Sequence, residues 1–71
     1  MMGVNYKRLW KRLIDDDMEA SALYAAAKIA PSTFSKMRKN EYVSLNVLVR
    51  ICNELRCQLS DIVEVELDNR S

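Results

Sequence analysis

The sequence predicts an all-α fold from three observations. The chain of 71 residues contains one glycine and one proline, which leaves few turn residues for tight hairpins. Apolar residues make up 49% of the chain and charged residues 30%, a balance typical of a compact folded protein. Apolar side chains also recur at helical spacing in several stretches. We therefore expect one compact domain over residues 1–71, with a core of about residues 5–66 and frayed termini.

Composition disfavours several classes of protein. The chain has no histidine and no glycine-rich phosphate loop, and no apolar run approaches the roughly 18–20 residues of a membrane span. Cys52 and Cys57 are too few to complete a zinc site, and we expect Cys52 to be a buried free thiol. Three aspartates at residues 15–17 indicate a helix end and a loop rather than a metal site. We expect a cytoplasmic protein that is not an enzyme, with no catalytic residue, no metal and no cofactor.

Charge is distributed unevenly along the chain. Residues 1–40 carry eight lysines and arginines against four acids, whereas residues 41–71 carry three against six. The net charge of +1 hides this asymmetry. A basic front and an acidic back are consistent with a surface that binds a polyanion, and equally with ordinary solvated helix faces.

The first predicted helix runs from about Asn5, as its N-cap, to Asp15 or Asp16. Its apolar residues have the i, i+3, i+4, i+7, i+8 spacing of an amphipathic helix, and its other face is basic. The apolar positions are Tyr6, Leu9, Trp10, Leu13 and Ile14. A second, shorter helix is predicted from Met18 to Ala27. Either Glu19 or Ser21 caps its start, and Leu23 and Ala26 face inward.

The third predicted helix, residues 31–39, is the stretch that presents side chains to a partner. Pro31 suits the first helical position, where an N–H group is not needed. Phe34 and Met37 are three residues apart and so share the face that anchors the helix to the core. Asn40 stands where a helix commonly ends in a left-handed residue, a conformation that asparagine tolerates well.

The fourth predicted helix begins after Ser44, a good N-cap, and is the central core helix. Its apolar stripe consists of Leu45, Leu48, Val49, Cys52 and Leu55, widened by Val47 and Ile51. Ser60 then caps a single helical turn from Asp61 to about Glu64. Residues 63–67 alternate apolar and acidic side chains, so they either end this last helix or form a short edge strand that pairs with a second copy.

Two short helices joined through residues 28–30, followed by a longer core helix, form a helix-turn-helix whose second helix is exposed. Four segments carry a resemblance: Leu23-x-x-Ala26, Ile29-Ala30-Pro31-Ser32-Thr33-Phe34-Ser35-Lys36-Met37, Ser44-Leu45-x-x-Leu48-x-x-Ile51-Cys52 and Leu59-Ser60-Asp61-Ile62. In this order they resemble the Cro/C1-type (Xre-family) helix-turn-helix domain over about residues 6–66. The resemblance implies a compact five-helix, lambda-repressor-like domain that binds operator DNA, commonly as a dimer.

The resemblance also implies roles for individual residues. The expected contacts to base edges are Pro31, Ser32, Ser35 and Lys36, and the expected contacts to the DNA backbone are Lys28, Thr33, Arg38, Lys39 and Asn40. Lys36 is the strongest candidate for base recognition because lysine can donate to guanine O6 and N7. Two departures stand out. Lys28 replaces the glycine that the family usually has in the turn, and Glu19 would repel a phosphate near the second helix.

These observations predict a bacterial or phage-derived, sequence-specific transcriptional regulator that binds double-stranded DNA, with helix 31–39 in the major groove. A protein-interaction module of the same fold, such as an antitoxin or an antirepressor-like partner using the acidic tail, is the alternative. A DNA-binding domain should show one positive patch around Lys28, Lys36, Arg38 and Lys39. A partner-binding module should expose an apolar patch or an unpaired strand edge at residues 63–67.

Overall fold

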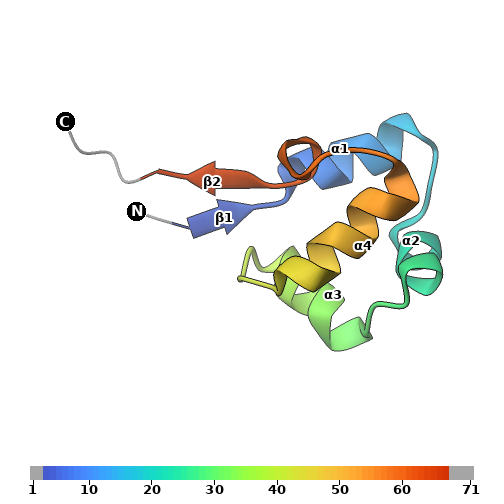
Figure 1. The fold of residues 1–71 in the computed structure, drawn as a ribbon, viewed down its shortest axis with the longest axis horizontal. Coiled ribbons are helices and arrows are strands. Elements are labelled where there is room, and N and C mark those ends of the chain that lie inside the picture. Colours follow the sequence, from blue (N-terminus) through green and yellow to red (C-terminus); the bar gives the residue numbers. More distant parts are fainter. Residues whose placement is uncertain (1–2, 68–71) are drawn as a thin grey trace.

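Four α-helices surround one apolar core, and a two-stranded ribbon projects from one side of it (Figure 1). The computed structural model describes residues 3–67. In chain order the elements are β1 (Gly3–Asn5), α1 (Lys7–Asp15), α2 (Ala20–Ala27), α3 (Pro31–Arg38), α4 (Leu45–Leu55), the 3-10 turn η1 (Leu59–Asp61) and β2 (Glu64–Glu66). The predicted all-α class is confirmed. No helix within residues 3–67 has the length and apolar character needed to cross a membrane.

The core draws one or more fully buried side chains from each helix. The largest are Tyr6, Leu9, Leu23, Met37, Ile51 and Ile62. Ile62 lies immediately after η1, so the end of the chain closes the core against α1 and α4. Burial of six large apolar side chains supplies the main stabilisation of a domain this small.

The predicted fifth helix is wrong in kind and position. Residues 59–61 form a single 3-10 turn whose N-cap is Gln58, not Ser60. The backbone N–H of Gln58 donates to Asp61 Oδ2 at 2.9 Å, a capping-box hydrogen bond at the start of the turn. The chain is then extended from Glu64, so the fold has four α-helices and one 3-10 turn among the described residues.

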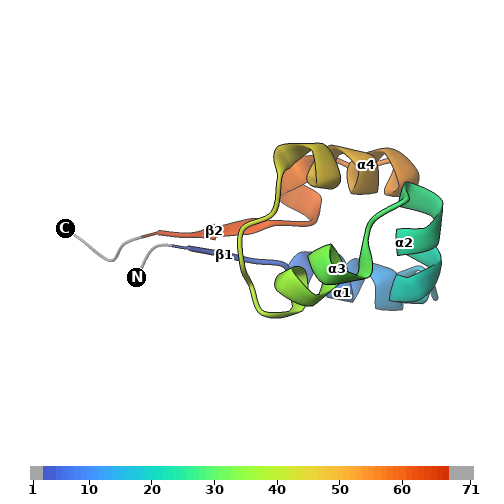
Figure 2. The same ribbon diagram turned by 90° about the horizontal axis from the view of Figure 1, so that it is seen from below.

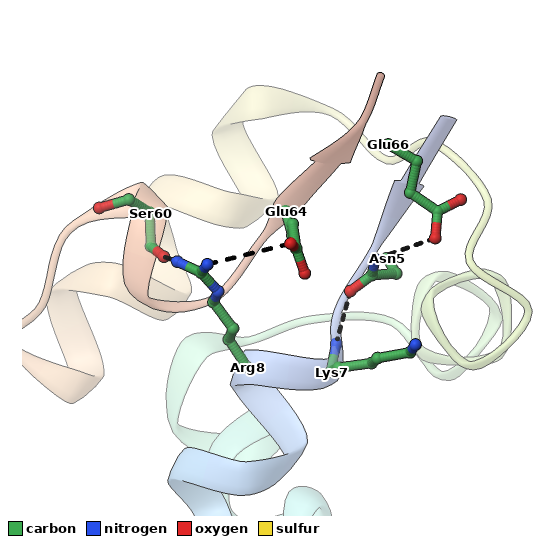
Figure 3. A network of polar contacts seen from close by, with 6 residues as sticks. All are labelled: Asn5, Lys7, Arg8, Ser60, Glu64 and Glu66. Atoms are coloured by element: carbon green, nitrogen blue, oxygen red, sulfur yellow. Dashed lines mark hydrogen bonds and ion pairs between the residues drawn. The ribbon is translucent and has the colours of Figure 1, made fainter. Parts of the chain in front are cut away.

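The tail forms a strand, and its partner is in the same chain. β1 and β2 pair antiparallel, with Val4 opposite Val65 and Gly3 opposite Glu66. The sequence analysis did not predict β1, because three residues are too few to show an alternating pattern. Side chains reinforce the ribbon in Figure 3: Asn5 Nδ2 donates to Glu66 Oε2 at 3.0 Å, and Arg8 pairs with Glu64 at 3.9 Å.

The prediction of Asn5 as the N-cap of α1 is wrong. Asn5 belongs to β1, and Tyr6 takes the cap position. The side chain of Asn5 nevertheless serves the helix start: its Oδ1 accepts from the backbone N–H of Lys7 at 3.2 Å. At the other end of α1, Ile14 is 77% exposed although the spacing predicted it inward. Leu13, in the same turn, is buried instead.

The buried face of α2 is offset by one residue from the prediction. The helix begins at Ala20, and its buried residues are Leu23, Tyr24 and Ala27, whereas Ala26 is exposed. Glu19 occupies the N-cap position but makes no side-chain capping hydrogen bond. Tyr24 determines the offset, since its large ring fills space between α2 and α3 that an alanine would leave empty.

α4 buries a narrower stripe than the sequence predicted. Ile51 and Leu55 are buried, but Leu45 and Val49 are 61% and 53% exposed, and Cys52 is half-buried rather than fully buried. A domain with so few elements can cover one line of the helix but not both flanks of a wide apolar face. Ser44 is the predicted N-cap, and its Oγ accepts from the N–H of Val47 at 3.3 Å.

All four helices end in the same way. A non-glycine residue in the left-handed region follows each helix; these residues are Asp17, Lys28, Asn40 and Arg56, with φ between 54° and 59°. The next N–H then bonds back to a carbonyl five residues earlier, as from Ile29 to Tyr24 at 2.9 Å. Asn40 was predicted in this conformation, and Lys28 was predicted to hold it without glycine. Each helix therefore stops at a defined residue.

Candidate nucleic-acid interface

The turn between α2 and α3 sets the position of α3. Lys28 has φ 58° and ψ 50°, and it reverses the chain after α2. Ala30 is extended, so the segment between the two helices is seen as a stretched connection in Figure 2. Pro31 occupies the first position of α3, where its lack of an N–H group costs no hydrogen bond. Arg50 of α4 fixes the turn from outside by donating from Nη1 to the carbonyl of Lys28 at 3.3 Å.

Two apolar side chains hold α3 on the core, as predicted. Met37 is fully buried, and its sulfur accepts from the hydroxyl of Tyr24 at 3.6 Å. The ring of Phe34 is half-buried and meets the ring of Tyr24 edge-on, with centroids 4.0 Å apart. Burial in this cluster raises the pKa of Tyr24 well above its usual value, and the charge of Arg38 acts in the opposite direction.

The opposite face of α3 is polar and exposed. Ser32, Lys36 and Lys39 recur at i, i+4 and i+7, so they lie along one line pointing away from the core. The other exposed residues of the predicted set are Pro31, Ser35, Lys28, Arg38 and Asn40. This line carries hydroxyl and ammonium groups without a large apolar side chain. It presents hydrogen-bond donors and positive charge to the outside.

Arg38 lies apart from this face. Its guanidinium carbon is 4.7 Å from the ring centroid of Phe34 and 5.3 Å from that of Trp10. A guanidinium within about 6 Å of a ring face is attracted by the ring quadrupole. Arg38 is therefore engaged with the aromatic cluster although its side chain is solvent-exposed. Arg38 and Lys39 were both expected contacts to the DNA backbone.

A hollow of about 300 Å³ adjoins the exposed face of α3. It is lined by Thr33, Lys36, Tyr42, Val43, Ser44 and Val47. Thr33, a predicted backbone contact, is half-buried in its wall. Tyr42 is 69% exposed and is not among the residues predicted to contact DNA. An aromatic residue in a short polar loop next to the exposed helix was the available signal.

Exposed acidic side chains lie in the sequence on both sides of the cations of the turn and α3. Glu41 follows Asn40 directly and is exposed, which bounds the positive surface on the side of the 41–44 loop. Glu19 is exposed at the start of α2, where the predicted phosphate contact was already in doubt. Lys28, Lys36 and Lys39 remain as exposed cations on the turn and on α3.

The helix α3 is the second helix of a helix-turn-helix, and it is anchored on one face and polar on the other. This arrangement defines the class of DNA-binding helix-turn-helix domains. The chain belongs to the Cro/C1-type HTH DNA-binding domain family, whose model matches residues 8–68. It is also similar to the crystal structure of the transcriptional regulator VanUg, form II, with 48% sequence identity and a TM-score of 0.90. That match covers 94% of this chain and 89% of the other. No curated protein sequence matched the chain significantly.

Proposed function

We propose that this protein is a transcriptional regulator that recognises a specific DNA sequence with α3 in the major groove. The observation that carries the proposal is the line of Ser32, Lys36 and Lys39, which points away from the core on a helix anchored by Phe34 and Met37. A major groove about 12 Å wide admits one helix, and side chains on its outer face then reach base edges. The similarity to a transcriptional regulator supports the same role.

Base recognition falls to four exposed residues of α3 in this proposal. Lys36 donates to guanine, while Ser32 and Ser35 each donate or accept and so discriminate more weakly. Pro31 offers only an apolar contact, for example to a thymine methyl group. All four side chains are exposed, so none has to leave the core to reach the groove.

Contacts to the sugar-phosphate backbone come from the margins of α3. Lys28 and Lys39 supply charge at its two ends, and Thr33 and Asn40 supply hydrogen-bonding groups. We add Tyr42 to the predicted set, because its exposed phenol lies beside Thr33 and Lys36 around the same hollow. Arg38 contributes less than the lysines because its guanidinium is held over two rings.

The decisive experiment is a selection of binding sites from random duplex DNA at low salt, with the recovered pool retested at higher salt. An enriched consensus that survives the higher salt is the expected result. If retention is weak, steeply salt-dependent and without an enriched sequence, only non-specific electrostatic binding remains and the proposal fails.

Lys36→Ala then tests the role of one side chain. We expect an unchanged thermal melt and a loss of about 1–3 kcal/mol in binding to the selected site, with relaxed preference at one base position. Lys11→Ala is the matched control, because this exposed lysine lines a hollow beside Ser60 and Asp61 on the side of η1. Equal loss on all sequences would make Lys36 a phosphate contact instead.

We further propose that the regulator acts as a dimer paired through the outer edge of β1. Among the described residues each strand of the ribbon has one neighbour, which leaves one edge of each strand unpaired. A two-fold pairing of β2 centred on Val65 would set Glu64 opposite Glu66 of the second copy, and like charges directly opposite each other are destabilising. The same pairing of β1 centred on Val4 sets Gly3 opposite Asn5 and brings no charges together.

The ribbon supplies a matched pair of variants for this proposal, because Val4 and Val65 are cross-strand neighbours on one face. Sedimentation should show a dimer for the wild type, a monomer for Val4→Lys and a dimer for Val65→Lys, with both variants still folded by their melts. Dissociation by Val65→Lys alone would move the interface to β2.

A second candidate function rests on the exposed tail. Val65 and Leu67 are 62% and 79% exposed beside an unpaired strand edge, the feature expected of a module that binds another protein. The partner would be a protein of the toxin or repressor kind. If site selection gives no consensus, and Leu67→Ser abolishes recovery of one specific partner protein, this candidate replaces the first.

A further inference from the structure

The two cysteines lie together at the end of α4, outside the surface discussed so far. Cys52 is in the last turn of the helix, and Cys57 is the first residue after the left-handed Arg56. The backbone N–H of Cys57 donates to the carbonyl of Cys52 at 3.1 Å. Residues joined by this helix-ending hydrogen bond lie side by side, and their side chains commonly touch. In the other three helices the corresponding pairs contain no cysteine.

Both thiols reach the surface. Each side chain is half-buried, and both line one open cavity together with Val49, Asn53, Arg56 and Gln58. The walls of this cavity belong to α4 and to the segment that follows it. A small molecule can therefore approach either sulfur without unfolding the helix.

The thiols also influence one another. Burial and, after it, the neighbouring Cys57 thiol raise the pKa of the Cys52 thiol to about 11. Cys52 is therefore protonated at neutral pH and is a slow nucleophile toward an external reagent. A mixed disulfide on Cys57 would instead lie next to the Cys52 thiol, at high effective concentration.

We propose that Cys52 and Cys57 form a site of reversible oxidation, in which an intramolecular disulfide arises by exchange with a low-molecular-weight disulfide of the glutathione class. In the first step the sulfur of Cys57 attacks the small disulfide, a mixed disulfide forms, and one small thiol leaves with the proton that Cys57 gave up. In the second step the sulfur of Cys52 attacks the Cys57 sulfur, and the second small thiol leaves with the Cys52 proton. The two cysteines are oxidised and the small disulfide is reduced to two thiols.

This site is independent of the proposed function. The bond would close a ring across the end of α4 and would fix the left-handed Arg56 within it. The proposed recognition helix α3 is a separate element, Pro31–Arg38. Closing a ring restricts mainly the unfolded chain, so the oxidised protein should melt at a higher temperature than the reduced protein. The alternative is that the two sulfurs are merely the apolar contact that accompanies many helix ends.

The experiment incubates the reduced full chain with mixtures of reduced and oxidised glutathione, followed by acid quenching and intact-mass analysis. The wild type should lose two hydrogen atoms and carry no glutathione. Trypsin cuts after Arg50 and after Arg56, and the second cut falls between the two cysteines. In the oxidised protein the peptide 51–56 should therefore remain linked to the peptide that begins at Cys57 until reductant is added.

Single variants provide the controls. Cys52→Ala keeps an apolar group at the helix end and should stop at the mixed disulfide on Cys57, and Cys57→Ser should react much more slowly because only Cys52 remains. The melting temperature should rise by several degrees on oxidation of the wild type and of neither variant. Three results for the wild type would overturn the proposal. It could accumulate two glutathione adducts, form a disulfide between two chains, or stay reduced under conditions in which Cys52→Ala reacts.

Discussion

The left-handed residue in the helix-turn-helix offers a direct test of how this fold manages without glycine. Lys28 has φ 58° and ψ 50°, in a region where the Cβ atom crowds the backbone. The conformation costs an ordinary L-residue about 1–2 kcal/mol, and glycine avoids that cost. Glycine also gives the unfolded chain more freedom, which offsets part of the gain. Lys28→Gly should therefore raise the free energy of unfolding by about 1 kcal/mol.

The change has few side effects in the folded state. The groups of Lys28 that bond within the structure are backbone atoms: its carbonyl accepts from Arg50 and its N–H donates to the carbonyl of Ala25. Both bonds survive replacement of the side chain. In a domain of this size 1 kcal/mol corresponds to a rise of about 4–8 °C in melting temperature, which circular dichroism resolves easily.

Lys28→Ala is the matched control, since it removes the same charge but keeps the Cβ atom. It should melt at or slightly below the wild-type temperature, so that the difference between the glycine and alanine variants isolates the backbone conformation. Asn40→Gly should gain less than Lys28→Gly, because asparagine tolerates the same φ of 59° better than lysine. If Lys28→Gly is no more stable than Lys28→Ala, the assignment of strain to this turn is wrong.

Three further predictions concern the cluster behind α3. Phe34→Ala should lower the free energy of unfolding by about 3 kcal/mol, the low end of the range for core phenylalanines because this ring is half-buried, and a melt indistinguishable from wild type would refute the anchoring role. Arg38→Gln should cost about 1 kcal/mol of stability through its two rings and change the salt dependence of DNA binding less than Lys39→Gln does. The pKa of Tyr24 is raised by burial from the ordinary 10.0, so above about pH 10 the unfolded chain loses a proton that the folded chain keeps, and stability should fall as the pH rises. Tyr24→Phe should flatten that fall in urea titrations, and an unaltered pH dependence would contradict the assignment.

The helices α3 and α4 could be predicted from the sequence because each has a clear start or end. Pro31 and Ser44 mark starts, Asn40 marks an end, and the spacing of Phe34 and Met37 fixes the inward face of α3. These are local signals, since they depend on residues within one or two turns. The exposed positions of α3 follow from the same spacing, whereas the division of these positions into base and backbone contacts comes from the resemblance to the Cro/C1-type family.

The features that could not be predicted depend on contacts between segments that are distant in the sequence. The strand β1 exists because residues 64–66 return to it, more than fifty residues later in the chain. Leu45 and Val49 are apolar, yet they stay exposed because no element between residues 3 and 67 covers that flank of α4. Apolar spacing states which face can be buried, but the number of elements available to cover it decides how much of that face is buried.

Arg38 shows the same limit within the site itself. It lies two residues from Lys36, a separation that places the two side chains on different sides of a helix. Residues 31–39 carry three cations, but the rings of Trp10 and Phe34 hold one of them, Arg38, against the body of the domain. Fewer cations are therefore available to a phosphate backbone than the sequence of this region suggests. Lys28, Lys36 and Lys39 are the exposed cations of the turn and α3 that are not held by a ring. Since each phosphate contact contributes a slope of roughly 0.9 to the salt dependence, one domain with Lys28 and Lys39 as such contacts would show a slope of roughly −1.8. Binding this modest favours two domains acting on one site, and the proposed pairing of copies through β1 would then be as important for recognition as the residues of α3.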